Sequence, residues 1–271
     1  MRVNVYDVDG KSVGEVDLPS VFKTPYRPDL IKRAVLSLQS SRRQLYGTNV
    51  LAGKRTSAHY HGKRHYRFSM MNKEMARIKR IHGKSATGTY LAMRARFVPQ
   101  ATKGRRAHPP KATKVWLQEI NKKELFLSLK SAIAATCNQD LVKERGHRFD
   151  HKVPIIIDDS VESVSKTKDI FNLLEKIGLE NEIERCKDKK VRAGKGKMRG
   201  RKYRKKKGIL FVLSNKANAL KAAKNIAGAD VISVDELLEN KNTELLAPGA
   251  IAGRLAVFSK ASLHKLNEIQ Q

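Results

Sequence analysis

The positive charge of this 271-residue chain is concentrated in two segments, and this distribution constrains its architecture more than any other feature. Residues 42–114 contain 19 lysines and arginines against one acid, Glu74, and residues 187–207 contain 13 against one acid, Asp188. Together the two segments carry the whole formal net charge of +30, so the remaining residues are electrically balanced. Because like charges at this density oppose compaction, the pattern predicts a neutral globular body with two cationic segments that bind a polyanion.

The composition excludes several classes of protein. Apolar residues make up 40% and charged residues 30%, which is typical of a chain that builds a globular core. No run approaches the roughly 18 apolar residues of a membrane span, and the first residues lack the apolar core of a signal peptide. Two cysteines, Cys137 and Cys186, are too few for a disulfide framework or a four-cysteine zinc site. We therefore expect a cytoplasmic protein with no membrane partner.

Apolar periodicity outside the basic segments predicts alternating strands and helices. Strands are expected at residues 3–9, 12–18, 153–157, 208–213, 230–234 and 254–258, the first two forming a hairpin around Asp9-Gly10. Helices are expected at residues 29–46, 121–137, 167–177, 214–227, 235–239 and 260–269, with Asn121, Ser214-Asn215 and Ser233 as caps. Repeated strand–helix units predict an α/β fold, a mainly parallel sheet covered by helices in three layers.

Residues 46–111 are predicted to form a long basic loop inserted in the body, which itself spans residues 1–45 and 112–271. A connection of about 70 residues far exceeds the usual 4–6, and insertions of that length are normally functional or disordered. The charge predicts that the loop stays largely unfolded by itself and orders when phosphates neutralise it. Its lysines and arginines then pair with phosphates, while tyrosine and histidine rings stack on unpaired bases. Met71, Met75 and Ile78 allow one short helix within it.

A second basic loop, residues 187–207, lies within the predicted body. Its glycines, Gly194, Gly196 and Gly200, have the wrong spacing for a dinucleotide-binding motif, and no Gly-Lys-Ser/Thr follows as a phosphate-binding loop requires. We interpret it as an RNA-binding loop, in which glycines let the backbone approach RNA and basic side chains pair with phosphates. Tyr203 either stacks on a base or packs against the sheet, and the sequence leaves both open.

Histidines offer weaker candidates for a metal site or for catalysis. The only carboxylate near them in the basic loop is Glu74, and a flexible loop gives no frame for a pair of catalytic imidazoles. We therefore predict no metal, no cofactor and no catalytic residue. The loop histidines are expected to stack on bases or to contact phosphates, and they are His59, His61, His65 and His82.

Three other positions have competing interpretations. Asp158-Asp159 follow a predicted strand, where α/β enzymes often place acidic groups, but a helix start or a solvated turn explains them equally well. Cys137 is expected to be a core thiol. Trp116 is expected to anchor the body rather than to offer a base-stacking surface.

Short motifs spread along the chain carry a resemblance to a known family. In chain order they are Leu18-Pro19-x-Val21-Phe22, Pro25-x-Arg27-x-Asp29-Leu30-Ile31, Ala52-Gly53-x-x-Thr56-x-Ala58, Val98-Pro99-Gln100-Ala101-x-Lys103-Gly104-Arg105-x-Ala107-His108-Pro109-Pro110, Ala132-x-Ala134-Ala135-Thr136, Gly200-Arg201-Lys202-Tyr203-Arg204 and Leu246-Ala247-Pro248-Gly249. Together they resemble the large-subunit ribosomal protein four family, in its archaeal and eukaryotic branch, over essentially the full chain. The length suits an archaeal member, because eukaryotic relatives usually carry a long C-terminal extension.

The resemblance implies a function. In that family an α/β body lies near the solvent side of the large ribosomal subunit, and a long loop threads into the ribosomal RNA. The tip of the loop narrows the polypeptide exit tunnel beside a second ribosomal protein. The resemblance therefore implies a non-enzymatic structural protein of the cytoplasmic large subunit. Its partners would be large-subunit rRNA and neighbouring ribosomal proteins, including the one that shares the tunnel constriction.

The resemblance and the charge pattern together give two sets of candidate residues. The rRNA-binding set is Arg42, Arg43, Lys54, Arg55, Thr56, Lys63, Arg64, Arg67, Arg77, Lys79, Arg80, Lys84, Arg94, Arg96, Lys103, Gly104, Arg105, Arg106, His108, Arg199, Arg201, Lys202, Tyr203 and Arg204. The tip is expected within residues 59–84, and the tunnel-lining candidates are His59, Tyr60, His61, Gly62, Lys63, Arg64 and His65. Many relatives have a glycine-rich turn at the tip, whereas residues 60–65 of this chain contain one glycine, Gly62.

Two other classes of protein remain open from the sequence. An RNA-processing or nucleotide-binding α/β enzyme with basic extensions would use the body for chemistry, and hydrolysis lost on substitution of Asp158 or His61 would favour it. A DNA-compacting protein would prefer duplex DNA to structured RNA at matched salt.

Overall fold

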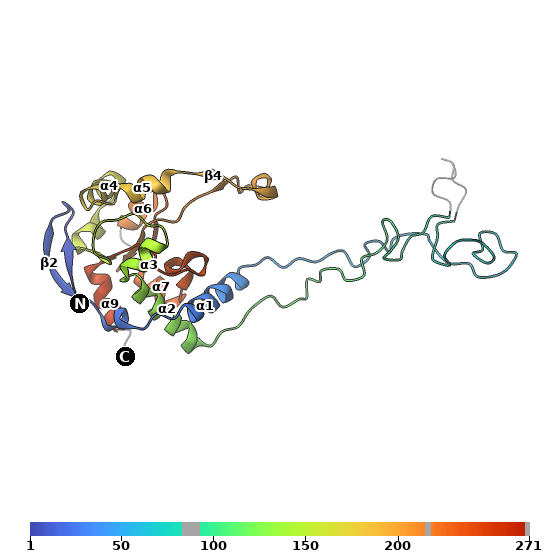
Figure 1. The fold of residues 1–271 in the computed structure, drawn as a ribbon, viewed down its shortest axis with the longest axis horizontal. Coiled ribbons are helices and arrows are strands. Elements are labelled where there is room, and N and C mark those ends of the chain that lie inside the picture. Colours follow the sequence, from blue (N-terminus) through green and yellow to red (C-terminus); the bar gives the residue numbers. More distant parts are fainter. Residues whose placement is uncertain (83–92, 215–217, 269–271) are drawn as a thin grey trace. The chain divides into compact units, whose positions relative to one another are not determined.

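A computed structural model describes residues 1–82, 93–214 and 218–268 of the chain. It contains two compact units, each with its own internal contacts (Figure 1). The body consists of Met1–Arg42 and Leu117–Gln271, and the basic arm consists of Arg43–Trp116.

The body is built on a mixed, mostly parallel sheet. Its described strands are β1 (Arg2–Tyr6), β2 (Ser12–Asp17), β3 (Ile155–Ile157), β6 (Leu210–Leu213), β7 (Asp230–Ser233) and β8 (Ala256–Ser259), in the spatial order β2-β1-β3-β8-β6-β7. β1 and β2 form the predicted antiparallel hairpin, and the other neighbouring pairs are parallel. Phe258 of β8 lies between Ile156 and Val212 of the adjacent strands. The prediction of an α/β fold with a mainly parallel sheet is confirmed.

Helices cover both faces of this sheet, because β3, β6 and β8 are buried at every position. Alternate residues point to opposite faces, so Phe258 enters one hydrophobic core and Val257 enters the other. The first core packs against α1 (Pro28–Ser41), α2 (Lys122–Ala135), α7 (Val234–Glu239), α8 (Thr243–Leu246) and α9 (Lys260–Glu268). The second packs against α3 (Gln139–Glu144), α4 (Thr167–Lys176), α5 (Glu180–Lys187) and α6 (Asn218–Lys224).

The helix boundaries differ from the prediction at several points. α1 ends at Ser41 rather than at residue 46, and Leu45 is 52% exposed, so a longer helix would bury nothing more. Asn121 is the N-cap of α2, but its side chain makes no capping hydrogen bond. Ser233 does cap α7, since its hydroxyl accepts from the Glu236 amide at 3.3 Å. The Ser214-Asn215 cap and the end of the last predicted helix lie partly outside the described residues.

The short helices α3 and α5 are absent from the prediction. They have 6 and 8 residues, and each has too few apolar repeats to show a helical period. They nevertheless bury Val142 and Ile183 in the second core, so tertiary packing stabilises helices that local periodicity does not reveal.

The described residues of the basic arm contain no helix and no strand, only isolated β-bridges that join His59 to Arg80 and Arg80 to Ala95. The short helix expected near Met75 is therefore wrong, because residues 71–78 form turns and bends. Met75 is 40% exposed, so apolar residues at helical spacing had no apolar surface to bury against.

The second basic segment, residues 187–207, forms a small hairpin within the body. β4 (Lys190–Val191) pairs antiparallel with β5 (Tyr203–Arg204), and a 3-10 helix (Gly194–Arg199) lies between them. We refer to residues 187–207 as the basic hairpin.

Candidate nucleic-acid interface

Close backbone contacts hold two segments of the basic arm together, residues 48–53 and residues 105–110. The amide of Thr48 donates to the carbonyl of Pro110 at 3.2 Å, and Gly53 lies directly against Arg105. A Cβ atom at Gly53 would be 2.6 Å from the Cα of Arg105, and the φ angle of Gly53 is +73°. Only glycine fits this approach, so the Ala52-Gly53 motif has a structural reason within the arm.

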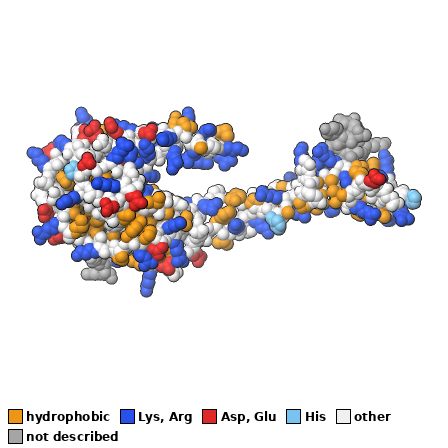
Figure 2. All heavy atoms as spheres, viewed as in Figure 1, with side chains coloured by type: hydrophobic (Ala, Val, Ile, Leu, Met, Phe, Trp, Pro, Cys, Tyr) orange, Lys and Arg blue, Asp and Glu red, His pale blue; other side chains and the backbone are white. Residues whose placement is uncertain are grey.

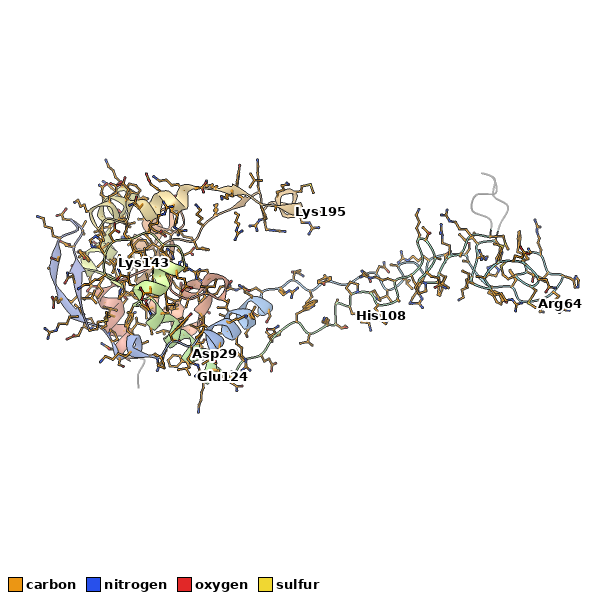
Figure 3. The ribbon with its side chains drawn as sticks, viewed as in Figure 1. Asp29, Arg64, His108, Glu124, Lys143 and Lys195 are labelled. Carbon is orange, nitrogen blue, oxygen red and sulfur yellow. The ribbon has the colours of Figure 1, made fainter. Side chains whose placement is uncertain are left out.

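Further along the arm, three segments run beside one another. The amide and carbonyl groups of His59 and Arg80 exchange hydrogen bonds of 3.2 and 3.1 Å, and Arg80 also bridges to Ala95. In Figure 3, side chains project outward along the arm from His108 to Arg64. The arm is a thin framework, and most of its side chains are therefore available to a partner.

The cations of the arm have no acidic partners. No ion pair joins the described residues of the arm, and Glu74 is its only acid. Figure 2 shows Lys and Arg spread over the arm, whereas both signs of charge are mixed over the body. The predicted rRNA-binding residues that are exposed in the arm are Arg43, Lys54, Arg55, Lys63, Arg64, Arg67, Arg77, Lys79, Arg94, Lys103, Arg106 and His108. Unpaired cations at this density are suited to the closely spaced phosphates of a nucleic acid.

Other predicted contacts already have partners within the chain. Arg80 donates to the carbonyls of Met93 and Ala76 at 2.8 and 3.0 Å. Arg96 donates to the carbonyl of Thr102 at 2.5 Å. The half-buried members of the set are Thr56, Arg80, Arg96, Gly104 and Arg105.

Two predicted residues lie elsewhere. Arg42 belongs to the body, where its guanidinium pairs with Glu244 at 2.6 Å. Lys84 lies outside the described residues.

Several cations of the arm lie over aromatic rings. Arg43 and Lys114 lie 4.2 and 4.5 Å from the centre of the Trp116 ring, and Lys79 lies 4.2 Å from that of Phe97. Tyr46 packs beside Trp116 at 5.6 Å between ring centres. Trp116, expected to anchor the body, has these contacts inside the arm. Combined ring and cation surfaces of this kind suit stacked bases and their phosphates.

The backbone of the arm is strained at five non-glycine residues among those that the structure describes. Each has a positive φ angle, between +57° and +75°, where a side chain clashes with its own backbone. Each such position costs about 1–2 kcal/mol unless surrounding contacts offset it. The five residues are His65, Phe68, Met93, Phe97 and Lys103. Asn72 also has a positive φ angle, of +55°, which asparagine adopts readily.

The basic hairpin presents a second cationic surface. Gly194 and Gly200 have φ angles of +72° and +77°, with open space where a Cβ atom would lie. Tyr203 is 45% exposed and Lys202 lies 5.4 Å from its ring, which favours stacking on a base over packing against the sheet. Lys195 is at the tip of the hairpin in Figure 3. The predicted residues exposed on it are Arg199, Arg201, Lys202, Tyr203 and Arg204.

A cleft of about 690 Å³ lies beside this hairpin. No local pattern in the sequence predicts it. Arg145, Arg185 and Lys205 line it together with residues from α3 and the last part of the chain. Burial, and then the nearby charges of Arg254 and Arg185, lower the pKa of Arg145 to about 10. A bound anion would relieve this repulsion, so the cleft is a candidate phosphate site. Only the folded chain brings these residues together, since Arg145 and Arg185 come from outside the two basic segments and Lys205 comes from the basic hairpin.

The acids with a possible catalytic role have structural roles instead. Asp158 caps the 3-10 helix Asp159–Ser163 by accepting from the Ser160 amide. Hydrogen bonding with the Ser160 side chain, and then with the backbone amides, holds the pKa of Asp158 below its usual value against burial. Asp159 accepts from the Ala261 amide at 2.7 Å. Cys137 was expected to be a core thiol; it is half-buried and packs against the first core, and burial raises the pKa of its thiol to about 12.

Three of the five histidines of the arm come together. One ring nitrogen from each of His59, His61 and His82 lies within 4.8 Å of the others, whereas His65 is outside the group. Their spacing along the chain does not predict which of them meet, because His82 is distant from the other two.

No helix among the described residues combines the length and apolar character that a membrane span requires. A sequence profile described as the ribosomal protein L4/L1 family matches residues 16–269. The large ribosomal subunit protein uL4 of Methanocaldococcus jannaschii is 48% identical to this chain, over 99% of each. That of Methanosphaera stadtmanae is 42% identical over 100% of this chain and 98% of the relative, and that of Haloarcula marismortui is 43% identical over 99% and 100%.

Proposed function

This chain belongs to the ribosomal protein L4/L1 family, and from that premise we propose that it is a structural constituent of the large ribosomal subunit. It binds large-subunit rRNA in the cytoplasm through the basic arm and the basic hairpin. It has no enzymatic role, and family membership supports this prediction.

The unpaired charge of the arm is the observation that carries the proposal. The arm places exposed lysines and arginines on a thin backbone with one acid and no ion pair among its described residues. A soluble surface normally mixes both signs of charge, so a surface of one sign points to a partner of the opposite sign. Rings beside the cations favour RNA, whose unpaired bases offer stacking faces.

The finer parts of the proposal concern placement. The body remains near the particle surface, and the loop of residues 46–111 threads between RNA helices that repel one another without its cations. Its tip, within residues 59–84, lines part of the polypeptide exit tunnel beside a second ribosomal protein. The exposed side chains of Tyr60, Lys63 and Arg64 support this assignment, since they are free to face the RNA or a nascent chain.

Sedimentation of cell extract through a sucrose gradient tests the proposal. The chain is expected in the large-subunit fractions at moderate salt, and to leave them only at high salt. Recovery mainly in the light fractions at moderate salt would overturn the assignment. Crosslinking of purified large subunits then tests the placement, because Lys63 and Arg64 should crosslink to rRNA or to a stalled nascent chain. Crosslinks at these positions to neither would remove the tunnel assignment and leave the ribosomal one intact.

A further inference from the structure

Three histidines of the basic arm surround one point, and we propose that His59, His61 and His82 bind a divalent transition-metal ion, for which Zn²⁺ is the best match. One ring nitrogen from each lies within 4.8 Å of the others. The centres of the three rings are 4.2, 4.5 and 4.7 Å apart. We term these residues the histidine cluster. The proposal goes beyond the ribosomal function and does not depend on it.

Hydrogen bonds to backbone carbonyls fix which nitrogen of two rings is free. Nδ1 of His59 lies 2.9 Å from the carbonyl of Ser57, and Nε2 of His82 lies 3.1 Å from the carbonyl of His59. Because a carbonyl only accepts, both of these nitrogens carry the proton. The lone pairs of neutral rings are then on Nε2 of His59 and Nδ1 of His82. A carbonyl on the second nitrogen is the usual outer support of a metal-bound histidine.

The free nitrogens are poorly satisfied by the protein alone. Nδ1 of His82 is buried and has no hydrogen-bond partner among the described residues. Nε2 of His59 lies 2.5 Å from Nε2 of His61, so one proton is shared between these nitrogens. A metal ion would give each nitrogen its own bond. Tetrahedral zinc with Zn–N bonds near 2.0–2.1 Å places its ligand atoms roughly 3.3 Å apart, which small rotations of the rings achieve.

The arm provides a frame for the cluster that its sequence does not reveal. His59 is held by the backbone of Arg80, and the carbonyl of His61 accepts from the Met70 amide at 3.0 Å. Met70 is fully buried, so this part of the arm has a small core of its own. Tyr66 stacks on His61 at 5.5 Å, and Phe68 lies 5.3 Å from His82. The ring faces partly shield the cluster from water.

The chemistry of the ligand set selects the ion. Three imidazoles leave a fourth position open for water or a phosphate oxygen, and imidazole suits Zn²⁺, Cu²⁺ and Ni²⁺ rather than Mg²⁺ or Ca²⁺. A bound metal ion would link His59 and His61 to His82.

Metal titration of the untagged, full-length chain tests the proposal. Calorimetry with Zn²⁺ should show one ion per chain, and Co²⁺ as a spectroscopic probe should show the visible absorption of a nitrogen-coordinated tetrahedral ion. His61→Ala and His82→Ala should each weaken binding by more than about 100-fold, the upper end of the loss from an outer-sphere change. Binding should also weaken as pH falls below about 6.5, where free imidazoles protonate.

A matched control is available four residues away. His65 is outside the cluster, and its φ angle of +57° suits asparagine, so His65→Asn should bind Zn²⁺ as the parent does. The unfolding transition of the body reports that this unit is folded in each variant. Absence of stoichiometric binding, or equal binding by the parent and His61→Ala, would overturn the proposal. Equal weakening by His65→Asn would also overturn it, because it would indicate nonspecific uptake.

Discussion

Arginine has opposite roles in the two units of this molecule. In the body, Arg254 is fully buried, donates to the carbonyl of Gly208 at 2.8 Å and pairs with Asp230 at 2.7 Å. In the arm, Arg64 and Arg67 are exposed, and no acid of the arm pairs with them. A cation that pairs with an acid of the same chain holds parts of the fold together. A cation without such a partner can pair with an anionic ligand instead.

This contrast predicts that RNA affinity and folding stability depend on separate residues. Affinity should depend on the arm, whose cations lack internal partners, and stability on the body, whose apolar side chains fill two cores. Variants of each unit, measured for RNA affinity and for the free energy of unfolding, test this separation.

The largest effect is expected from neutralising the arm. Glutamine in place of ten exposed cations should lower the affinity for large-subunit rRNA at least about 10⁴-fold at moderate salt, because each phosphate contact releases counterions. The slope of log affinity against log salt should become less negative by roughly 7–9, the contribution of ten phosphate contacts, and the contribution of the basic hairpin should remain. The ten are Arg43, Lys54, Arg55, Lys63, Arg64, Arg67, Arg77, Lys79, Lys103 and Arg106.

A control with ten lysine-to-arginine or arginine-to-lysine exchanges at the same positions keeps the charge and should keep most of the slope. The unfolding free energy of the body should be the same in both variants. A steep salt dependence that survives neutralisation would assign RNA binding to the body and contradict the comparison.

The second largest effect is expected in the body. Phe258 is fully buried at the centre of the sheet and contacts Phe22 edge to face at 5.5 Å. Phe258→Ala should lower the unfolding free energy by about 3–5 kcal/mol, because it removes apolar contacts and leaves a cavity. The matched change in the arm, Tyr60→Ala, removes a ring that is 42% exposed. It should change the unfolding free energy by less than about 0.5 kcal/mol. Urea titration followed by far-UV circular dichroism measures both.

These two predictions rest on features that are both visible in the sequence. The short apolar runs that became β3, β6 and β8 indicate strands buried on both faces, and they predict the parallel sheet. The charge segregation also needs only counting. Both features are local or additive along the chain, so a single sequence reveals them.

Contacts between distant residues were not predictable in this way. The histidine cluster depends on the pairing of His59 with Arg80, and nothing in either segment specifies that pairing by itself. The basic cleft depends on α3 and α5, which are too short to show a period. Arg254 begins a predicted strand, but its burial depends on Asp230 from another strand. The histidine cluster, the basic cleft and the burial of Arg254 can therefore be seen only in the folded structure.

A pH effect of intermediate size is expected from a buried group of the body. Nδ1 of His147 donates to Glu182 at 2.6 Å, and its Nε2 is buried without a partner among the described residues. Protonation of Nε2 would bury an unpaired donor, and burial lowers the pKa of His147 below its ordinary 6.5. The folded state therefore favours the neutral ring. This stability is present above pH 6.5 and is lost as pH falls through 6.5 towards the lower pKa of the folded state.

The unfolding free energy should fall by about 1.4 kcal/mol for each unit by which the pKa of His147 differs between the unfolded and folded states. Unfolding free energies of the parent and of His147→Gln, compared between pH 7.5 and pH 5, measure it. The variant keeps a donor for Glu182 but does not titrate, so its profile should be flatter. Glu182 does not obscure the comparison, since hydrogen bonds from Arg185 and His147 hold its pKa at about 2 against burial. Its own contribution is present above pH 4.5 and is lost only as pH falls towards 2. Equal profiles would show that His147 is not held neutral.

The smallest effect is expected in the basic hairpin, which contains both paired and exposed cations. Lys206 pairs with Asp188 at 2.9 Å and lowers the pKa of that carboxyl, while Lys202 and Arg204 are exposed. Asp188→Asn should free Lys206 for a phosphate, so the log–log salt slope should steepen by about 0.7–0.9 and the affinity should rise less than about tenfold. Stability should change by less than about 1 kcal/mol, because exposed ion pairs contribute little. An unchanged slope would mean that Lys206 does not reach RNA, and a large loss of stability would mean that the Lys206–Asp188 pair supports the fold of the body.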